Sequence, residues 1–198
     1  MARVLFIDNF DSFTYNLVDE FECLGHQINV VRNSVELDTL QTLAEQHDLL
    51  VISPGPGSPS DAGNCANLLN RIAGIIPVLG ICLGHQLIVE VFGGKVGKAE
   101  EPCHGKSSML THHQEFCFEN FDSPIQVGRY HSLTALQVPE GFKVLATSDD
   151  LVMSVYDPVR QLLGFQFHPE SLLTTSGTQL LANSIHLLLD KKNMGASK

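Results

Sequence analysis

The chain has 198 residues, of which 43% are hydrophobic and 17% charged, and this length and composition are typical of one folded domain. Twelve Lys and Arg against 22 Asp and Glu give a formal net charge of −10. This balance disfavours nucleic acids and anionic membranes as partners, because both attract positively charged surfaces.

In the first half, apolar runs predict strands over residues 4–7, 28–31, 49–52 and 78–81. Periodic apolar residues predict a helix after each strand. These helices run from Asp11 or Ser12 to Gly25, over residues 35–46, from Ser60 or Asp61 to Ile72, and from the turn after residue 81 to Phe92. Fully apolar strands that alternate with helices indicate a parallel sheet with helices on both faces.

The second half has short segments that predict antiparallel strands added to the same domain. They cover residues 107–110, 115–118, 127–130, 144–146, 152–156 and 162–167. A last helix is predicted over residues 178–190, with Lys191 and Lys192 suiting its negative end and a frayed tail after it.

Targeting and membrane signals are weak in this chain. The N-terminal apolar run is too short for a signal peptide. Residues 72–89 carry no formally charged residue, but glycines, a proline and polar residues interrupt them, which favours a strand, a turn and a helix start over a membrane span. The five cysteines are odd in number and form no Cys-x-x-Cys pair, which indicates a reduced, cytoplasmic protein.

The strongest chemical motif is Gly80-Ile81-Cys82-Leu83-Gly84, which directly follows an apolar strand and precedes a helix. This context is typical of a nucleophile elbow, in which two glycines permit a sharp turn. The turn would lift the Cys82 sulfur onto the positive end of the next helix, which favours the thiolate. The alternative is a buried structural cysteine, but both glycines and both flanking elements favour the nucleophile.

A thiolate nucleophile needs a proton carrier, which is usually a histidine oriented by a carboxylate. His168-Pro169-Glu170 supplies both groups at the end of a strand-like segment. Alone, His168 would fit a surface or core histidine equally well, but together with the elbow it predicts a Cys82, His168 and Glu170 triad.

The loop Ser53-Pro54-Gly55-Pro56-Gly57-Ser58-Pro59 follows the third strand and exposes backbone N–H groups at its glycines. With the N–H of Leu83 these groups can form an oxyanion hole, whereas the alternative is a rigid turn without chemistry.

A phosphate loop at His104 to Ser107 is rejected because no strand precedes it and Glu100 occupies the required glycine position. A metal site from Cys103, His104, His112 and His113 is not favoured, because no pair has zinc-finger spacing. Phe10 is an apolar residue in the loop after the first strand, which suggests a contact surface there.

Taken together, these motifs resemble the class I, or triad-type, glutamine amidotransferases over nearly the whole chain. Further segments are similar to one branch, the glutaminase subunits of anthranilate synthase and of aminodeoxychorismate (4-aminobenzoate) synthase. These segments are Asp8-Asn9, residues 11–16, His104-Gly105-Lys106, Tyr130-His131-Ser132-Leu133 and the residues from Pro169 to Gly177. The resemblance implies one amidotransferase domain over residues 1–198, with a flavodoxin-like open parallel sheet and added antiparallel strands.

The resemblance also implies the reaction. Cys82 would attack the side-chain amide of L-glutamine, His168 would protonate the departing ammonia, and Glu170 would orient the imidazole. Gly57 and Leu83 would donate N–H groups to the oxyanion beside Pro56, and Gly55, Gln86, Ser132 and Leu133 would bind glutamine. No cofactor is implied in this chain, and Mg²⁺ is expected only in a large chorismate-binding synthase subunit, component I of either enzyme.

Several alternatives stay open at this point. The product could be anthranilate or 4-aminobenzoate, or one chain could serve both; the Thr174-Thr175-Ser176-Gly177 run favours anthranilate. Two functions of other classes are a stand-alone cysteine hydrolase and a catalytically silent regulatory subunit. The silent subunit would require a replaced triad residue, and the His-Pro-Glu pairing and the proline-glycine loop disfavour the hydrolase.

Overall fold

The computed structural model of the protein describes residues 1–99 and 104–190. Its strands are β1 (Arg3–Asp8), β2 (Gln27–Arg32), β3 (Leu49–Ile52), β4 (Val78–Ile81), β5 (Lys95–Lys98), β6 (Lys106–His112), β7 (Ile125–Arg129), β8 (Leu133–Gln137), β9 (Lys143–Ser148), β10 (Leu151–Asp157) and β11 (Leu162–Phe165). Its α-helices are α1 (Thr14–Cys23), α2 (Leu37–Glu45), α3 (Cys65–Ile72), α4 (Leu83–Val91) and α5 (Gly177–Leu189). Short 3-10 helices lie at Pro59–Asp61 and Phe116–Phe118.

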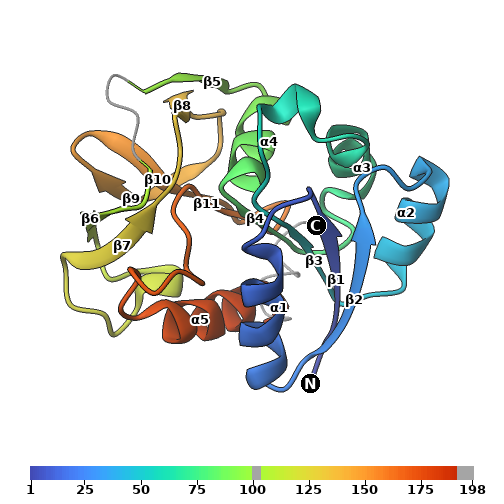
Figure 1. The fold of residues 1–198 in the computed structure, drawn as a ribbon, viewed down its shortest axis with the longest axis horizontal. Coiled ribbons are helices and arrows are strands. Elements are labelled where there is room, and N and C mark those ends of the chain that lie inside the picture. The colour runs from blue at the N-terminus through green and yellow to red at the C-terminus, as the bar shows by residue number, and fades with distance from the viewer. Residues whose placement is uncertain (100–103, 191–198) are drawn as a thin grey trace.

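One sheet runs through both halves of the chain, in the order β2-β1-β3-β4-β11-β10-β9-β6-β7 (Figure 1). The pairs from β2 to β11 are parallel, and those from β11 to β7 are antiparallel. Strands β5 and β8 form a side branch that joins β10 through β8. The parallel strand order is that of a flavodoxin-like sheet, which is the fold that the family resemblance implies.

Two apolar cores cover the two faces of the parallel sheet. Because strand side chains alternate, Val4 and Phe6 face one core, and Leu5 and Ile7 face the other. The first core is completed by α1 and α5, and the second by α2, α3 and α4 (Figure 1). The strands are buried on both faces, which explains their continuous apolar runs.

The predictions for the parallel strands and for α2, α4 and α5 are confirmed within a few residues. The predicted start of α1 is wrong: the helix begins at Thr14, and no side chain caps it at Phe13. Asp11 instead closes a turn just before the helix, where its Oδ1 accepts from the Phe13 N–H at 2.7 Å. The start of α3 is also wrong, because residues 59–61 form a separate 3-10 turn. The predictions for Lys191, Lys192 and the tail lie outside the described residues.

The second half contains the larger corrections. Residues 162–167 are predicted as an antiparallel addition, but β11 pairs in parallel with β4 and only its other edge is antiparallel, to β10. The strand predicted over residues 115–118 is wrong, because Phe116–Phe118 form a 3-10 helix, with Cys117 and Phe118 buried under α5. Strands β5 and β8 are absent from the prediction because their apolar residues are few and interrupted by glycine, lysine and threonine.

The apolar stretch at residues 72–89 is divided between the end of α3, the strand β4 and most of α4. Among the helices within residues 1–99 and 104–190, none is long and apolar enough to cross a membrane.

Candidate active site

The elbow at Cys82 has the geometry that its glycines predict. Cys82 links β4 to α4 with φ 52° and ψ −98°, a conformation that L-residues adopt rarely and that costs about 1–3 kcal/mol. A β carbon at Gly80 would collide with the backbone of Gly84, and one at Gly84 would collide with the carbonyl of Ile52. The two glycines therefore let α4 pack close to β3 and β4, and Cys82 stands at the amino end of the helix.

The proposed base and acid lie together beside this elbow. His168 Nδ1 and Glu170 Oε1 are 2.6 Å apart, and both side chains are buried. The strands β4 and β11 are parallel neighbours with Gly80 opposite Gly164, so Cys82 and His168 both leave the same edge of the sheet. The parallel register therefore joins two motifs that are more than eighty residues apart in the chain.

Electrostatics support a charged imidazole at this position. Burial by itself would lower the pKa of His168, but interactions with Cys82 and Glu170 outweigh it and raise the pKa to about 10. Since Glu170 occupies Nδ1, the interaction with Cys82 involves Nε2. That atom is buried and makes no hydrogen bond of regular geometry to any group in residues 1–99 or 104–190. The surroundings of His168 therefore favour the protonated imidazole.

Side chains from three other segments hold His168 in place. Its carbonyl accepts from Thr174 Oγ1 at 2.6 Å, and the same hydroxyl accepts from the Gly128 N–H at 2.9 Å. The rings of Phe13 and Tyr130 contact the imidazole edge-on, with centroids at 5.2 and 5.0 Å. The Tyr130 hydroxyl is 3.1 Å from Ser171 Oγ, which anchors the ring from behind.

The predicted oxyanion loop follows β3, next to the elbow. A β carbon at Gly55 would lie 2.6 Å from Leu83 Cδ2, which shows how closely the loop approaches the start of α4. Gly57 has φ +81°, a conformation that favours glycine, and a β carbon there would meet Asp61. Pro56 and Gly57 are exposed to solvent.

The loop after β1 is tied to the oxyanion loop by Asn9. Its backbone N–H donates to Ser53 Oγ at 2.9 Å, and its side chain donates to the Ser53 carbonyl at 3.0 Å. Asp8 organises the rest of the β1 loop: Oδ1 accepts from the Phe10 N–H and from Thr14 Oγ1, and Oδ2 pairs with Arg32 at 2.6 Å.

The predicted glutamine-binding residues Gln86, Ser132 and Leu133 lie near one another, at the start of α4 and of β8. Gln86 Nε2 donates to the Leu133 carbonyl at 3.3 Å, and the same carbonyl accepts from His131 Nδ1 at 2.8 Å. Gln86 is buried, whereas Ser132 is exposed and Leu133 half-buried. The Leu133 carbonyl is thus held from inside, and the Ser132 carbonyl accepts from the Ala99 N–H at 2.9 Å.

Three buried polar residues close to the predicted motifs were missed by the sequence reasoning. Gln166 Nε2 lies 3.8 Å from Cys82 Sγ. Arg129 Nε donates to His131 Nε2 at 3.2 Å. His85 is fully buried in α4, where burial and the nearby His131 lower its pKa to about 3. Each lies next to a motif residue, and a polar residue at a predicted core position is the signal that could have found it.

Within residues 1–99 and 104–190, the other candidate histidines and cysteines are not gathered into a second site. Both ring nitrogens of His112 already have partners, namely the Asp122 carbonyl and the Gln114 N–H. No group of three or more His, Cys, Asp or Glu side chains in the described part of the chain is arranged to hold a metal ion. Cys103 lies outside the described residues. Burial raises the pKa of both Cys65 and Cys117 to about 12, so these thiols suit the core and not catalysis.

Comparison with known families agrees with this geometry. The family model of class-I glutamine amidotransferases matches residues 5–188. This chain belongs to the class-I glutamine amidotransferase family.

Relatives of this amidotransferase share nearly half of its residues. It is 48% identical to anthranilate synthase component 2 of Vibrio parahaemolyticus over 195 residues, which cover 98% of this chain and 100% of the relative. It is 46% identical to the protein of the same name from Haemophilus influenzae, over 96% of this chain and 100% of the relative. A pyocyanine-specific anthranilate synthase component 2 of Pseudomonas aeruginosa is 49% identical, over 92% of each chain.

Solved structures share the fold of this amidotransferase. A putative GMP synthase subunit from Thermoplasma acidophilum has a TM-score of 0.85 at 26% identity, covering 100% of this chain and 98% of that protein. A glutamine amidotransferase from Thermotoga maritima has a TM-score of 0.76 at 17% identity, covering 95% of this chain and 98% of that protein, a likeness of fold alone.

Proposed function

We propose that this amidotransferase is the glutaminase subunit of an anthranilate synthase, which hydrolyses L-glutamine and delivers ammonia to a chorismate-aminating subunit. The observation that carries the chemistry is the buried His168 and Glu170 pair, 2.6 Å apart, beside the Cys82 elbow. The pathway rests on the relatives named anthranilate synthase component 2, which match this chain over nearly its full length.

The chemistry follows from the charges of the triad. Cys82 attacks the amide carbon of glutamine as a thiolate, and the oxyanion that forms accepts N–H donors from Gly57 and Leu83. His168 Nε2 gives its proton to the departing nitrogen, so ammonia leaves and a glutamyl thioester remains. His168 then takes a proton from water, the hydroxide attacks the thioester, and glutamate leaves with the Cys82 thiolate restored. Glu170 keeps the imidazole oriented and balances its charge.

Substrate binding uses the exposed backbone on both sides of the nucleophile. Gly55 and Pro56 line one side of the glutamine site, and Ser132 and Leu133 line the other. Gln86 holds this second side through its hydrogen bond to the Leu133 carbonyl. The first assignment is supported by the position of the Gly55 loop after the parallel strand β3, at the carboxyl edge of the sheet, where ligands of such sheets bind. The second is supported by the hydrogen bond from Gln86, at the start of α4, to the Leu133 carbonyl.

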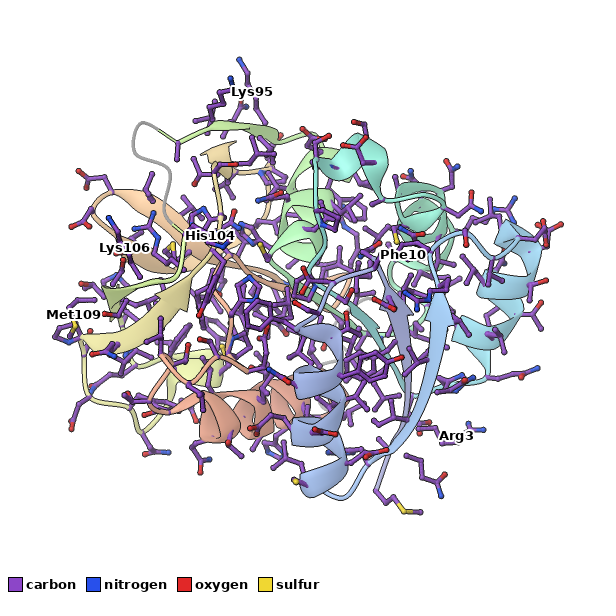
Figure 2. The ribbon with its side chains drawn as sticks, viewed as in Figure 1. Arg3, Phe10, Lys95, His104, Lys106 and Met109 are labelled. Carbon is purple, nitrogen blue, oxygen red and sulfur yellow. The ribbon has the colours of Figure 1, made fainter. Side chains whose placement is uncertain are left out.

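A partner surface is proposed at Phe10. Its side chain is 58% exposed beyond the end of β1, where Figure 2 labels it. The backbone there has φ 63°, and the Arg32 guanidinium lies over the ring at 4.6 Å, so the aromatic group is held outward rather than collapsed. Asn9 is hydrogen-bonded to Ser53, at the start of the loop that carries Gly57. A partner that shifts Phe10 would therefore also shift this loop.

The synthase subunit would act by selecting one conformation of that loop. If only one conformation aims the Gly57 N–H at the oxyanion, a partner that binds it preferentially raises glutaminase turnover. A bias of about 1.4 kcal/mol changes the competent population up to about tenfold. We also propose that this chain needs no cofactor, that Mg²⁺ serves the partner, and that both act in the cytoplasm.

The test measures glutamine hydrolysis by the chain alone and with chorismate and a synthase subunit, while ammonium replaces glutamine in a parallel assay. We expect slow hydrolysis alone, faster hydrolysis in the complex, and anthranilate as the product. Formation of the 4-aminobenzoate precursor with an aminodeoxychorismate synthase subunit would instead assign the chain to aminodeoxychorismate synthase. No glutamine hydrolysis with either partner would contradict the proposed function.

A further inference from the structure

Gln166 is a buried amide in a place that favours apolar residues. Phe165 and Phe167 on either side are fully buried and stack on each other at 4.9 Å between ring centroids. Gln166 is also fully buried and points to the opposite face, since side chains alternate along an extended chain. In the β4 and β11 register, Ile81 pairs with Phe165, so the next residues, Cys82 and Gln166, stand side by side.

The amide connects the nucleophile to the glutamine-binding residues. Gln166 Nε2 lies 3.8 Å from Cys82 Sγ, within hydrogen-bonding range for sulfur. Gln166 Oε1 accepts from Gln86 Nε2 at 3.2 Å, and Gln86 Nε2 also donates to the Leu133 carbonyl at 3.3 Å. Both atoms of the buried amide therefore have partners, and one of these partners is the reacting sulfur.

The direction of these hydrogen bonds follows from the groups at the far end. The Leu133 carbonyl can only accept, so Gln86 must turn its NH₂ group toward it. Gln166 must then present its oxygen to that same NH₂ group, which leaves its own NH₂ group facing Cys82. The amide orientation is imposed by the surrounding partners.

The same chain of hydrogen bonds continues beyond Leu133. Arg129 Nε can only donate, so the His131 Nε2 that it contacts at 3.2 Å must be the acceptor. The His131 proton therefore sits on Nδ1 and points at the Leu133 carbonyl. Burial, followed by the charge of Arg129, lowers the pKa of His131 to about 4, which keeps this tautomer neutral.

We propose that Gln166 is a further catalytic residue, whose NH₂ group stabilises the Cys82 thiolate formed when the thiol proton moves to His168 Nε2. A fixed N–H dipole aimed at a developing charge in a buried site is an effective form of electrostatic stabilisation. The helix end and the imidazolium are two further sources of positive potential at the sulfur, and Gln166 adds a third from the β11 side. This inference rests on the proposed function in one respect, that Cys82 is the nucleophile.

The test compares Gln166→Glu with Gln166→Met in the complete chain without a partner. Glutamate keeps an oxygen for Gln86 but turns a negative charge toward the sulfur, and methionine removes both polar contacts. The measurement is the rate at which iodoacetamide alkylates Cys82, followed by peptide mass mapping over a range of pH. In that reaction the sulfur forms a bond to carbon and iodide leaves, so the rate reports the thiolate.

We expect the alkylation rate near neutral pH to fall about tenfold in Gln166→Met, and further in Gln166→Glu, because a hydrogen bond to a charged group is lost or reversed. In strongly alkaline solution all rates should converge to within about twofold, since the thiol is then ionised in every variant. A purely structural role would lower the rate equally across the pH range. Ser154→Ala, a change at a buried side chain opposite Phe165 on β10, should keep the wild-type profile.

Unchanged pH profiles in Gln166→Glu would overturn the proposal. Should the variants fail to fold, side-chain ¹⁵N NMR of the wild-type chain gives a second test. The Gln166 NH₂ resonance should shift with pH in step with Cys82 alkylation, and the shift should vanish in Cys82→Ala. A Gln166 chemical shift that does not change with the ionisation of Cys82 overturns the proposal. An unreactive Cys82 in the wild-type chain overturns the proposed function itself.

Discussion

The parallel region, β2-β1-β3-β4-β11, and the antiparallel region, β5 to β10, contribute to the active site by different routes. In the parallel region, Cys82 and His168 directly follow neighbouring strands, and strand register places them together. In the antiparallel region, Tyr130 and Leu133 lie at the connection between β7 and β8 and reach the site through ring contacts and a carbonyl.

This difference separates reacting groups from supporting ones. The reacting groups lie just beyond the ends of strands that are buried on both faces, where packing limits their movement. The supporting groups stand on partly exposed backbone that can adjust to the substrate. We therefore expect changes in the parallel region to abolish chemistry and changes in the antiparallel region to weaken it.

The largest effect should come from Cys82→Ser. A hydroxyl is not ionised by surroundings that suit a thiol, so glutamine-dependent synthesis by the complex should fall by about 10³-fold or more. Synthesis from ammonium should stay at the wild-type level, because the partner carries out that step. Retained use of glutamine would contradict the assignment. In the wild-type chain, a glutamine-analogue electrophile should label Cys82 ahead of Cys23, Cys65, Cys103 and Cys117.

The second effect distinguishes the two residues of the His168 and Glu170 pair. His168→Ala removes the proton carrier and should lower glutaminase turnover by about 10³-fold. Glu170→Gln keeps the imidazole and loses only its orientation and charge balance, so its loss should be smaller. Steady-state glutamine hydrolysis in the complex measures both. A Glu170→Gln variant slower than His168→Ala would reverse the roles given to them.

His85 lies where the two regions meet, and it tests whether one buried histidine couples folding to pH. It lies in α4, its ring packs against Gly164 of β11, and the neighbouring His131 contributes to its lowered pKa of about 3. Since an unfolded histidine titrates near 6.5, the unfolded chain binds this proton first. The free energy of unfolding should therefore fall as pH decreases from 6.5 toward 3.

The slope for one such group is about 1.4 kcal/mol per pH unit, or about tenfold in the unfolding equilibrium. His85→Leu should remove that slope from the urea-unfolding free energy measured across this pH range. His113→Ala, which changes an exposed histidine, serves as the matched control and should retain the wild-type slope. Equal slopes in His85→Leu and wild type would show that this histidine does not couple folding to pH.

A smaller effect is expected from the antiparallel region at Tyr130. Tyr130→Ala removes an edge-on ring contact to His168, and turnover should fall by about tenfold as the imidazole becomes less well positioned. Tyr130→Phe keeps the ring and loses only the contact to Ser171, so its turnover should stay within about twofold of wild type. A loss in Tyr130→Ala as large as that of Cys82→Ser would break the distinction between the two regions.

The smallest effect concerns the partner. Phe10→Ala should lower the activation by the synthase subunit several-fold, while the slow hydrolysis by the chain alone stays unchanged. Val159→Ala is the matched control, because Val159 is also exposed but lies in the turn before β11, at the opposite edge of the sheet. Initial rates across a titration with the synthase subunit measure both variants. Equal activation of Phe10→Ala and Val159→Ala would place the partner surface elsewhere.

The sequence by itself determined the strands β1 to β4 and the turn at Cys82, because those signals are local. A fully apolar run of four residues marks a buried strand, and two glycines around Cys82 are required by the turn in which they lie. The His-Pro-Glu motif is local in the same sense, since the pairing of His168 and Glu170 spans only two residues.

Only the tertiary structure decided which distant groups meet. The direction of β11 depends on its pairing with β4, and the sequence of residues 162–167 does not indicate which strand they pair with. Strands β5 and β8 are stabilised by each other across a long stretch of chain, so their own sequences carry little strand signal. Gln166 likewise gains its place beside Cys82 from the same pairing of β4 and β11, because hydrogen bonds across strands depend on register and not on sequence distance.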